Sequence, residues 1–132
     1  KLYEGALATL DGLRARGIEL AVATGKSRRG LDRVLSSLGL AGYFDSTRCA
    51  DETHSKPHPR MLYEIMAARG KSPGDTVMIG DSEYDMDMAR QAGVRSVGVS
   101  FGVHDSDRLA SFGPLTVIDA LPELLELSAF GG

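Results

Sequence analysis

The stretch TVMIGDSEYD, residues 76–85, decides the fold of this chain. It begins with a short apolar run, which predicts a buried strand. Asp81 follows this run almost directly, and Asp85 comes four residues later. Residues 83–92 predict a helix that ends at Gly93. A buried strand that leads straight into a helix is the repeating unit of a parallel sheet covered by helices.

The rest of the chain repeats this alternation. Further strands are expected over residues 18–23, 45–50, 96–99 and 115–118. Further helices are expected before Gly17, between Ser27 and Gly39, between Pro59 and Gly70, and around residues 121–125. The sequence therefore predicts an α/β fold with three layers, Rossmann-like, with a mainly parallel sheet and right-handed crossovers. In such folds the chemistry lies beyond the carboxyl ends of the strands.

Composition excludes several classes of protein. The chain has 132 residues, 42% apolar and 25% charged, which fits one domain over residues 1–132. A net charge of -3 argues against binding to duplex nucleic acid, and no apolar run approaches the roughly 18 residues that span a membrane. Cys49 is the single cysteine, so we expect no disulfide within the chain and a reducing, cytoplasmic location.

Thr24-Gly25-Lys26-Ser27 directly follows the apolar run 18–23. A hydroxyl group and the backbone N–H groups of small residues, at a strand end and before a helix, suit a phosphoryl oxygen. The alternative is an ordinary turn in which Ser27 caps the next helix.

A second polar group is SKPHP, residues 55–59. The neighbouring prolines are expected to hold the backbone of Lys56 extended, so that its ammonium group can offset the charge of a phosphate or of carboxylates. The alternative is a solvated loop lysine. His54 and His58 are not expected to bind zinc, because no cysteine or third histidine lies near them.

Asp81 and Asp85 form the third and strongest group. Their four-residue spacing places both carboxylates on the same side of the first helical turn. Carboxylate oxygens are ligands suited to Mg²⁺. The alternative is that Asp81 only caps the helix.

With these residues, the chain resembles the haloacid dehalogenase superfamily, and most closely its branch similar to phosphoglycolate phosphatases. Thr24 matches the second motif of the superfamily, Lys56 the third, and Asp81 with Asp85 the fourth. The stretch TGKSRRGLDRVL, residues 24–35, also looks like that branch. The retention of both acids favours phosphate chemistry over cleavage of a carbon–halogen bond.

The resemblance implies a role for each matched residue. Thr24 and the Gly25 N–H, together with Lys26, would bind the phosphoryl group of a small phosphorylated metabolite. Lys56 would steady the nucleophile and the phosphate charge. Asp81 and Asp85 would form the Mg²⁺ site, with Asp85 also supporting Lys56. The reaction implied is Mg²⁺-dependent hydrolysis through an aspartyl-phosphate.

The nucleophilic aspartate of the superfamily's first motif, Asp-x-Asp-Gly-Thr after an apolar strand, is not found in the chain. Asp11, Asp85 and Asp105 each fail to match it in context. We therefore expect this motif and a cap domain upstream of Lys1, and residues 1–132 alone to be inactive. Since the superfamily's first strand is central, its neighbours would have unpaired edges. Either another segment supplies that strand, or the sheet closes up, or the chain is part of a longer protein, which we favour.

Other functions remain open at this point. A phosphomutase of the same superfamily would differ in the missing parts, and a binding module could lack the first motif altogether. A signalling receiver domain is disfavoured, because its acids precede its threonine and lysine. Phosphoglycolate is the first substrate to test. Arg28 and Arg29, beside the expected phosphate loop, either contact substrate or form a solvated pair at the helix start.

Overall fold

The computed structural model describes residues 5–101 and 105–132 of the chain. Its strands are β1 (Ala21–Thr24), β2 (Ser46–Cys49), β3 (Val77–Gly80), β4 (Arg95–Val99) and β5 (Thr116–Ile118). Its α-helices are α1 (Ala6–Ala15), α2 (Arg28–Ser37), α3 (Arg60–Arg69), α4 (Glu83–Ala92) and α5 (Ser106–Ala110). Three 3₁₀ turns, η1 (Pro73–Asp75), η2 (Leu121–Glu126) and η3 (Ser128–Phe130), complete the described elements.

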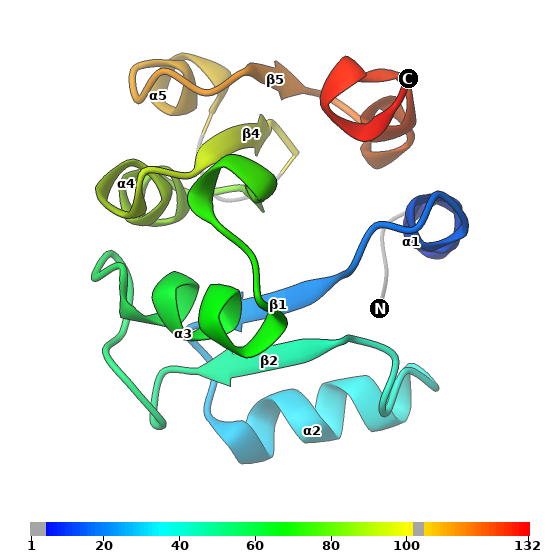
Figure 1. The fold of residues 1–132 in the computed structure, drawn as a ribbon, viewed down its shortest axis with the longest axis vertical. Coiled ribbons are helices and arrows are strands. Elements are labelled where there is room, and N and C mark those ends of the chain that lie inside the picture. The colour runs from blue at the N-terminus through cyan, green and yellow to red at the C-terminus, as the bar shows by residue number, and fades with distance from the viewer. Residues whose placement is uncertain (1–4, 102–104) are drawn as a thin grey trace.

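All described strand pairs are parallel, and they form two separate sheets (Figure 1). One sheet pairs β1 with β2, from Ala21 opposite Ser46 to Thr24 opposite Cys49. The other has the order β3-β4-β5. The predicted α/β fold with parallel strands is confirmed. Of the alternatives for the missing strand, closure of the sheet is wrong, because β1 and β3 are not paired with each other.

Helices cover both faces of the strands (Figure 1). On one face α3 and α4 pack together through buried side chains. Ala23 of β1 and Met78 of β3 are partly buried and pack against this cluster. Its buried residues are Met61, Leu62, Met66, Met88, Ala89, Ala92 and Val94. On the other face Leu13 of α1 and Leu124 of η2 share a core with β4 and β5. Each face therefore joins the two sheets through side chains rather than through a strand ladder.

The ends of the helices follow local sequence signals. Ser27 caps α2 by accepting a hydrogen bond from the Gly30 N–H at 3.0 Å. Gly93 ends α4 in the left-handed region, with a φ of 72°, which glycine adopts without the steric cost of a Cβ atom.

Two elements differ from the prediction. The last helix is the 3₁₀ turn η2 rather than an α-helix, and its Glu123 carboxylate accepts from the backbone N–H of Ala120 at 2.9 Å. The short α5 was not predicted, although Asp105 caps it by accepting from the Arg108 N–H at 2.9 Å. Among the helices of the described residues, none has the length and hydropathy needed to cross a bilayer.

Candidate active site

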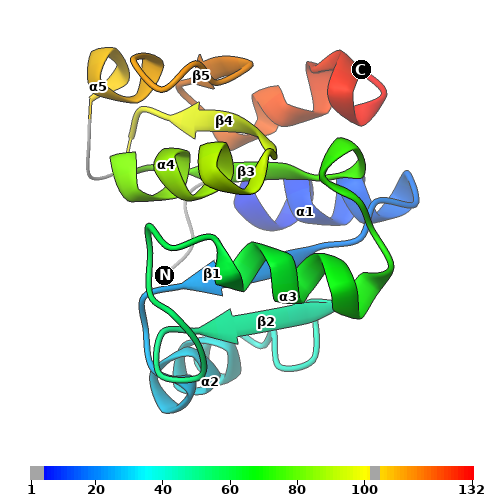
Figure 2. The ribbon, with the colours of Figure 1, turned by 60° about the vertical axis from the view of Figure 1, so that its left-hand side comes forward.

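The carboxyl ends of the parallel strands meet at one edge of the molecule. In Figure 2 the arrows of β1, β2 and β4 point the same way, so the loops that follow them lie on the same side. Thr24 ends β1, and Asp81 directly follows β3. The predicted phosphate and metal groups therefore lie on the same side of the molecule.

The loop after β1 is short and open. The Thr24 hydroxyl oxygen accepts a hydrogen bond from the Lys26 N–H at 3.1 Å. Its hydroxyl hydrogen stays available to donate to a phosphoryl oxygen. Gly25, Lys26 and Ser27 are exposed, and no atom comes within 4 Å of a Cβ atom placed on Gly25. Both readings of this loop are therefore compatible, since Ser27 caps α2 while Thr24 keeps a free donor.

Lys56 lies in the loop between β2 and α3, within a turn that the sequence did not predict. Residues 55–58 form a turn, in which the His58 N–H donates to the Ser55 carbonyl at 3.1 Å and the Lys56-Pro57 peptide bond is cis. The Lys56 ammonium group makes an ion pair with the Asp85 carboxylate on α4. Lys56 therefore links the half of the molecule that contains β2 to the half that contains β3.

Asp85 is buried and surrounded by donors. It is 4% exposed, and besides Lys56 it accepts from the Asp81 N–H at 3.2 Å and the Ser82 hydroxyl at 3.1 Å. The helix cap is Ser82, which accepts from the Asp85 N–H at 3.3 Å, and not Asp81. Asp81 thus lies before α4 rather than in its first turn, and no hydrogen bond or ion pair to its carboxylate is found within residues 5–101 and 105–132.

Gly80 makes this arrangement possible. A Cβ atom on Gly80 would lie 2.3 Å from the Cβ atom of Asp85. The end of β3 can therefore approach the first turn of α4 only because residue 80 has no side chain. In the sequence, the glycine between the apolar run and Asp81 is the signal for this contact.

We expect Gly80→Ala to lower the free energy of unfolding by about 1–3 kcal/mol, because the new methyl group pushes Asp85 away from its donors. Urea unfolding of the full-length protein measures this. Gly74→Ala is the matched control, since a Cβ atom there has its nearest contact at 3.9 Å. Equal stability of the two variants would contradict the argument.

Mg²⁺ was predicted at Asp81 and Asp85. In the described part of the chain no cluster of three or more His, Cys, Asp or Glu residues could hold a metal ion. The Asp81 carboxylate has no partner among the described residues, whereas the Asp85 oxygens accept from Lys56, Asp81 and Ser82. Mg²⁺ is commonly held by one or two carboxylates together with water and substrate phosphate, so these residues fit part of such a site.

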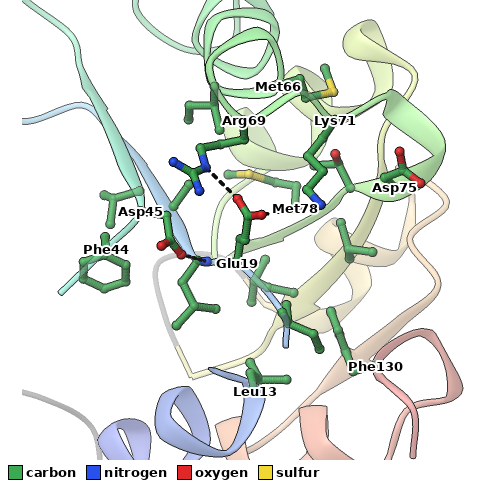
Figure 3. Close-up of a pocket in the computed structure, with 18 of the residues that line it drawn as sticks. Leu13, Glu19, Phe44, Asp45, Met66, Arg69, Lys71, Asp75, Met78 and Phe130 are labelled. Atoms are coloured by element: carbon green, nitrogen blue, oxygen red, sulfur yellow. Dashed lines mark hydrogen bonds and ion pairs between the residues drawn. The ribbon is translucent and has the colours of Figure 1, made fainter. Parts of the chain in front are cut away.

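A cavity of about 690 Å³ lies between the two sheets (Figure 3). It is lined by residues 18–23 on the side of β1 and by residues 76–79 on the side of β3. Leu62, Ile65 and Met66 of α3 line one wall, and Leu10, Leu13, Leu124 and Phe130 line another. The cavity therefore borders strands β1 and β3, each of which has one strand partner among the described residues.

One end of this cavity is charged. At the amino end of β1, Glu19 pairs with Arg69 at 2.6 Å and with Lys71 at 3.5 Å (Figure 3). Arg69 holds the pKa of the Glu19 carboxyl below its usual range. The charge of Glu19 is thus compensated by Arg69 and Lys71 at the end of β1 opposite Thr24. The other walls of the cavity are mostly apolar.

Known proteins share this sequence and this fold. A family model described as haloacid dehalogenase-like hydrolase matches residues 1–99. The chain belongs to the haloacid dehalogenase-like hydrolase family. The sequence-based recognition of this family is confirmed.

Relatives in the haloacid dehalogenase-like family are named as phosphatases. The chain is 36% identical over 125 residues to "Probable phosphatase IndB" of Dickeya dadantii, covering 94% of this chain and 54% of the relative. It is 32% identical to "Pyrophosphatase PpaX" of Halalkalibacterium halodurans, covering 95% and 59%. It is 33% identical to "Phosphoglycolate phosphatase 1" of Pseudomonas aeruginosa, covering 95% and 46%. The chain thus spans about half the length of these relatives.

A solved structure of the family agrees with this fold. The crystal structure of a "predicted phosphoglycolate phosphatase" from Haemophilus somnus superposes with a TM-score of 0.90 at 28% identity, covering 97% of this chain and 57% of that one. The arrangement of strands and helices described above is therefore that of a haloacid dehalogenase-like core.

Proposed function

We propose that the full-length protein is a Mg²⁺-dependent phosphatase of small phosphomonoesters, and that residues 1–132 are the part of its core domain that binds phosphate and metal. One observation carries the proposal: Lys56 is held by Asp85 directly beside Asp81, whose carboxylate has no partner in the described residues. A fixed cation next to a free carboxylate, at the edge where the Thr24 hydroxyl also lies, suits a phosphoryl group bound with a cation. The phosphatase names of the relatives support the same reading.

Each residue has a role in this proposal. The Thr24 hydroxyl and the N–H of Gly25 donate to phosphoryl oxygens, and Lys26 adds positive charge to the same exposed loop. Lys56 offsets negative charge on the phosphoryl group as it is transferred. Asp85 holds Lys56 in place, and Asp81 ligates the metal. Bound Mg²⁺ would neutralise charge that develops on the phosphoryl oxygens.

The nucleophile in this proposal is an aspartate outside residues 1–132. Its carboxylate attacks phosphorus, the alcohol leaves, and water then hydrolyses the aspartyl-phosphate. The strand that carries it would lie in the cavity between β1 and β3, parallel to both. Two features support this placement: the cavity borders both strands, and buried backbone groups without partners are costly. A cap domain outside residues 1–132 would then select the substrate.

An assay of the purified full-length protein tests the proposal. Phosphoglycolate, pyrophosphate and p-nitrophenyl phosphate are the substrates, each with Mg²⁺ and with excess EDTA. We expect hydrolysis of at least one of the two phosphomonoesters, phosphoglycolate and p-nitrophenyl phosphate, lost in EDTA and regained with added Mg²⁺. Phosphoglycolate is the first candidate, because the Pseudomonas aeruginosa relative is named for it. No hydrolysis of either phosphomonoester, or hydrolysis unaffected by EDTA, would contradict the proposal.

We also expect residues 1–132 alone to hydrolyse none of these substrates. The physical reason is that the described residues include no strand between β1 and β3, and so no aspartate at the end of such a strand. Turnover by the isolated chain at a rate near that of the full-length protein would place the nucleophile within these residues, against the proposal. Circular dichroism of the isolated chain checks that it is folded in this comparison.

A further inference from the structure

Two adjacent arginines, Arg28 and Arg29, begin α2, and their side chains differ in the contacts that they make. Arg29 is exposed, and no hydrogen bond or ion pair of its side chain is found in the described residues. The Arg28 guanidinium donates to both oxygens of Glu52, with its Nε 3.0 Å from Oε2 and its Nη2 2.9 Å from Oε1. It also donates to the Thr47 hydroxyl at 2.9 Å and to Asp32 at 3.2 Å. The solvated pair predicted as one alternative is therefore wrong for Arg28.

These contacts join the loop after β1 to the turn after β2. Backbone contacts connect the same two segments: the Ala50 N–H donates to the Lys26 carbonyl at 3.1 Å, and the Arg28 N–H donates to the Asp51 carboxylate at 3.0 Å. Glu52 is itself fixed, because its Oε1 accepts from the Cys49 N–H at 3.1 Å. The Arg28 guanidinium thus connects the start of α2, directly after the β1 loop, with the turn that follows β2.

The turn held by Arg28 leads directly to Lys56. The next residue after Glu52, Thr53, donates through its hydroxyl to Glu64 of α3 at 3.2 Å. In this segment, Glu52 is bonded to α2 and Thr53 is bonded to α3. Lys56, which pairs with Asp85, follows three residues after Thr53. A shift of Glu52 would move the base of the loop that carries Lys56.

We infer that the Arg28–Glu52 pair positions Lys56 relative to the phosphate loop of residues 24–26. Arg28 and Glu52 are positioning residues in this inference, which rests on the proposed phosphatase function. Arg28 lowers the pKa of the Glu52 carboxyl, so the pair stays ionised at neutral pH. The side chains are 35% and 36% exposed, and ion pairs that exposed add little to the stability of a fold. The geometry of the two loops is what the pair determines.

The test compares Arg28→Gln with Arg29→Gln in the full-length protein. We expect Arg28→Gln to lower kcat/KM by about 10- to 100-fold, because small displacements of groups around a reacting centre have effects of that size. The melting temperature should change little, and Arg29→Gln should match the wild type. Equal kcat/KM for the two variants, or a fall in melting temperature with kcat/KM unchanged, would overturn the inference.

A double-mutant cycle sharpens the test. Glu52→Gln should lower kcat/KM about as much as Arg28→Gln, and the double variant should fall no further, because all three lose the same contact. Additive losses would overturn the inference. The dissociation constant of inorganic phosphate, measured by calorimetry, gives a readout without turnover. If the wild type binds phosphate but hydrolyses nothing, the proposed function fails, while weaker phosphate binding by Arg28→Gln than by Arg29→Gln still supports the positioning role.

Discussion

Asp81→Asn in the full-length protein is expected to lower Mg²⁺-dependent hydrolysis of a generic phosphomonoester by on the order of a thousandfold, which corresponds to about 4 kcal/mol in the barrier. Asparagine keeps the shape of the side chain and removes its charge. The backbone N–H of Asp81, which donates to Asp85 at 3.2 Å, is unchanged by this substitution. The loss should therefore come from metal binding rather than from a collapse of the loop.

The measurement is kcat/KM of p-nitrophenyl phosphate hydrolysis as a function of Mg²⁺ concentration, together with the melting temperature. Asp87→Asn is the matched control. Asp87 lies on α4, six residues beyond Asp81, and its carboxylate pairs with Arg90 at 2.6 Å instead of facing the site. We expect Asp87→Asn to keep the activity of the wild type. Retention of the wild-type rate and Mg²⁺ dependence by Asp81→Asn would refute its assignment as a metal ligand.

The fold was predictable where the relevant forces are local. The helix predicted over residues 83–92 agrees with α4 at both ends, because the residues directly next to it determine them: Ser82 caps its start and Gly93 ends it. The strand ends at Thr24 and Gly80 were close to the prediction for the same reason: a short apolar run stops where a polar or small residue begins. Parallel pairing followed from the alternation of these elements.

Contacts between residues far apart in the chain were not predictable from the sequence. Arg28 and Glu52 are 24 residues apart, and nothing in either segment alone shows that the loops after β1 and β2 approach each other. Leu7 lies at three-residue spacing from Leu10 and Leu13, which is typical of one buried helical face, yet it is 42% exposed, because α1 buries Ala6, Thr9 and Leu13 instead. The turn at Lys56 was also missed, since neighbouring prolines restrict a backbone without determining which turn it makes.

Lys56→Met is expected to harm both stability and activity in the full-length protein. The Asp85 side chain is 6% exposed and that of Lys56 is 19% exposed, so the variant leaves a buried carboxylate without its cation. Removing one partner of a buried ion pair costs several kcal/mol; because Asp81 and Ser82 still donate to Asp85, we expect a loss of about 2–4 kcal/mol in the free energy of unfolding. Urea unfolding and the hydrolysis of p-nitrophenyl phosphate measure the two effects separately.

The double variant Lys56→Met with Asp85→Asn separates the structural role of the pair from its chemical role. A neutral amide at residue 85 needs no cation, and its oxygen can still accept from the Asp81 N–H, so most of the lost stability should return. Hydrolysis should stay at least about a hundredfold below the wild type, because the positive charge of Lys56 no longer faces the transferred phosphoryl group. Recovery of activity along with stability would show that Lys56 only balances Asp85, and its proposed role toward phosphate would have to be abandoned.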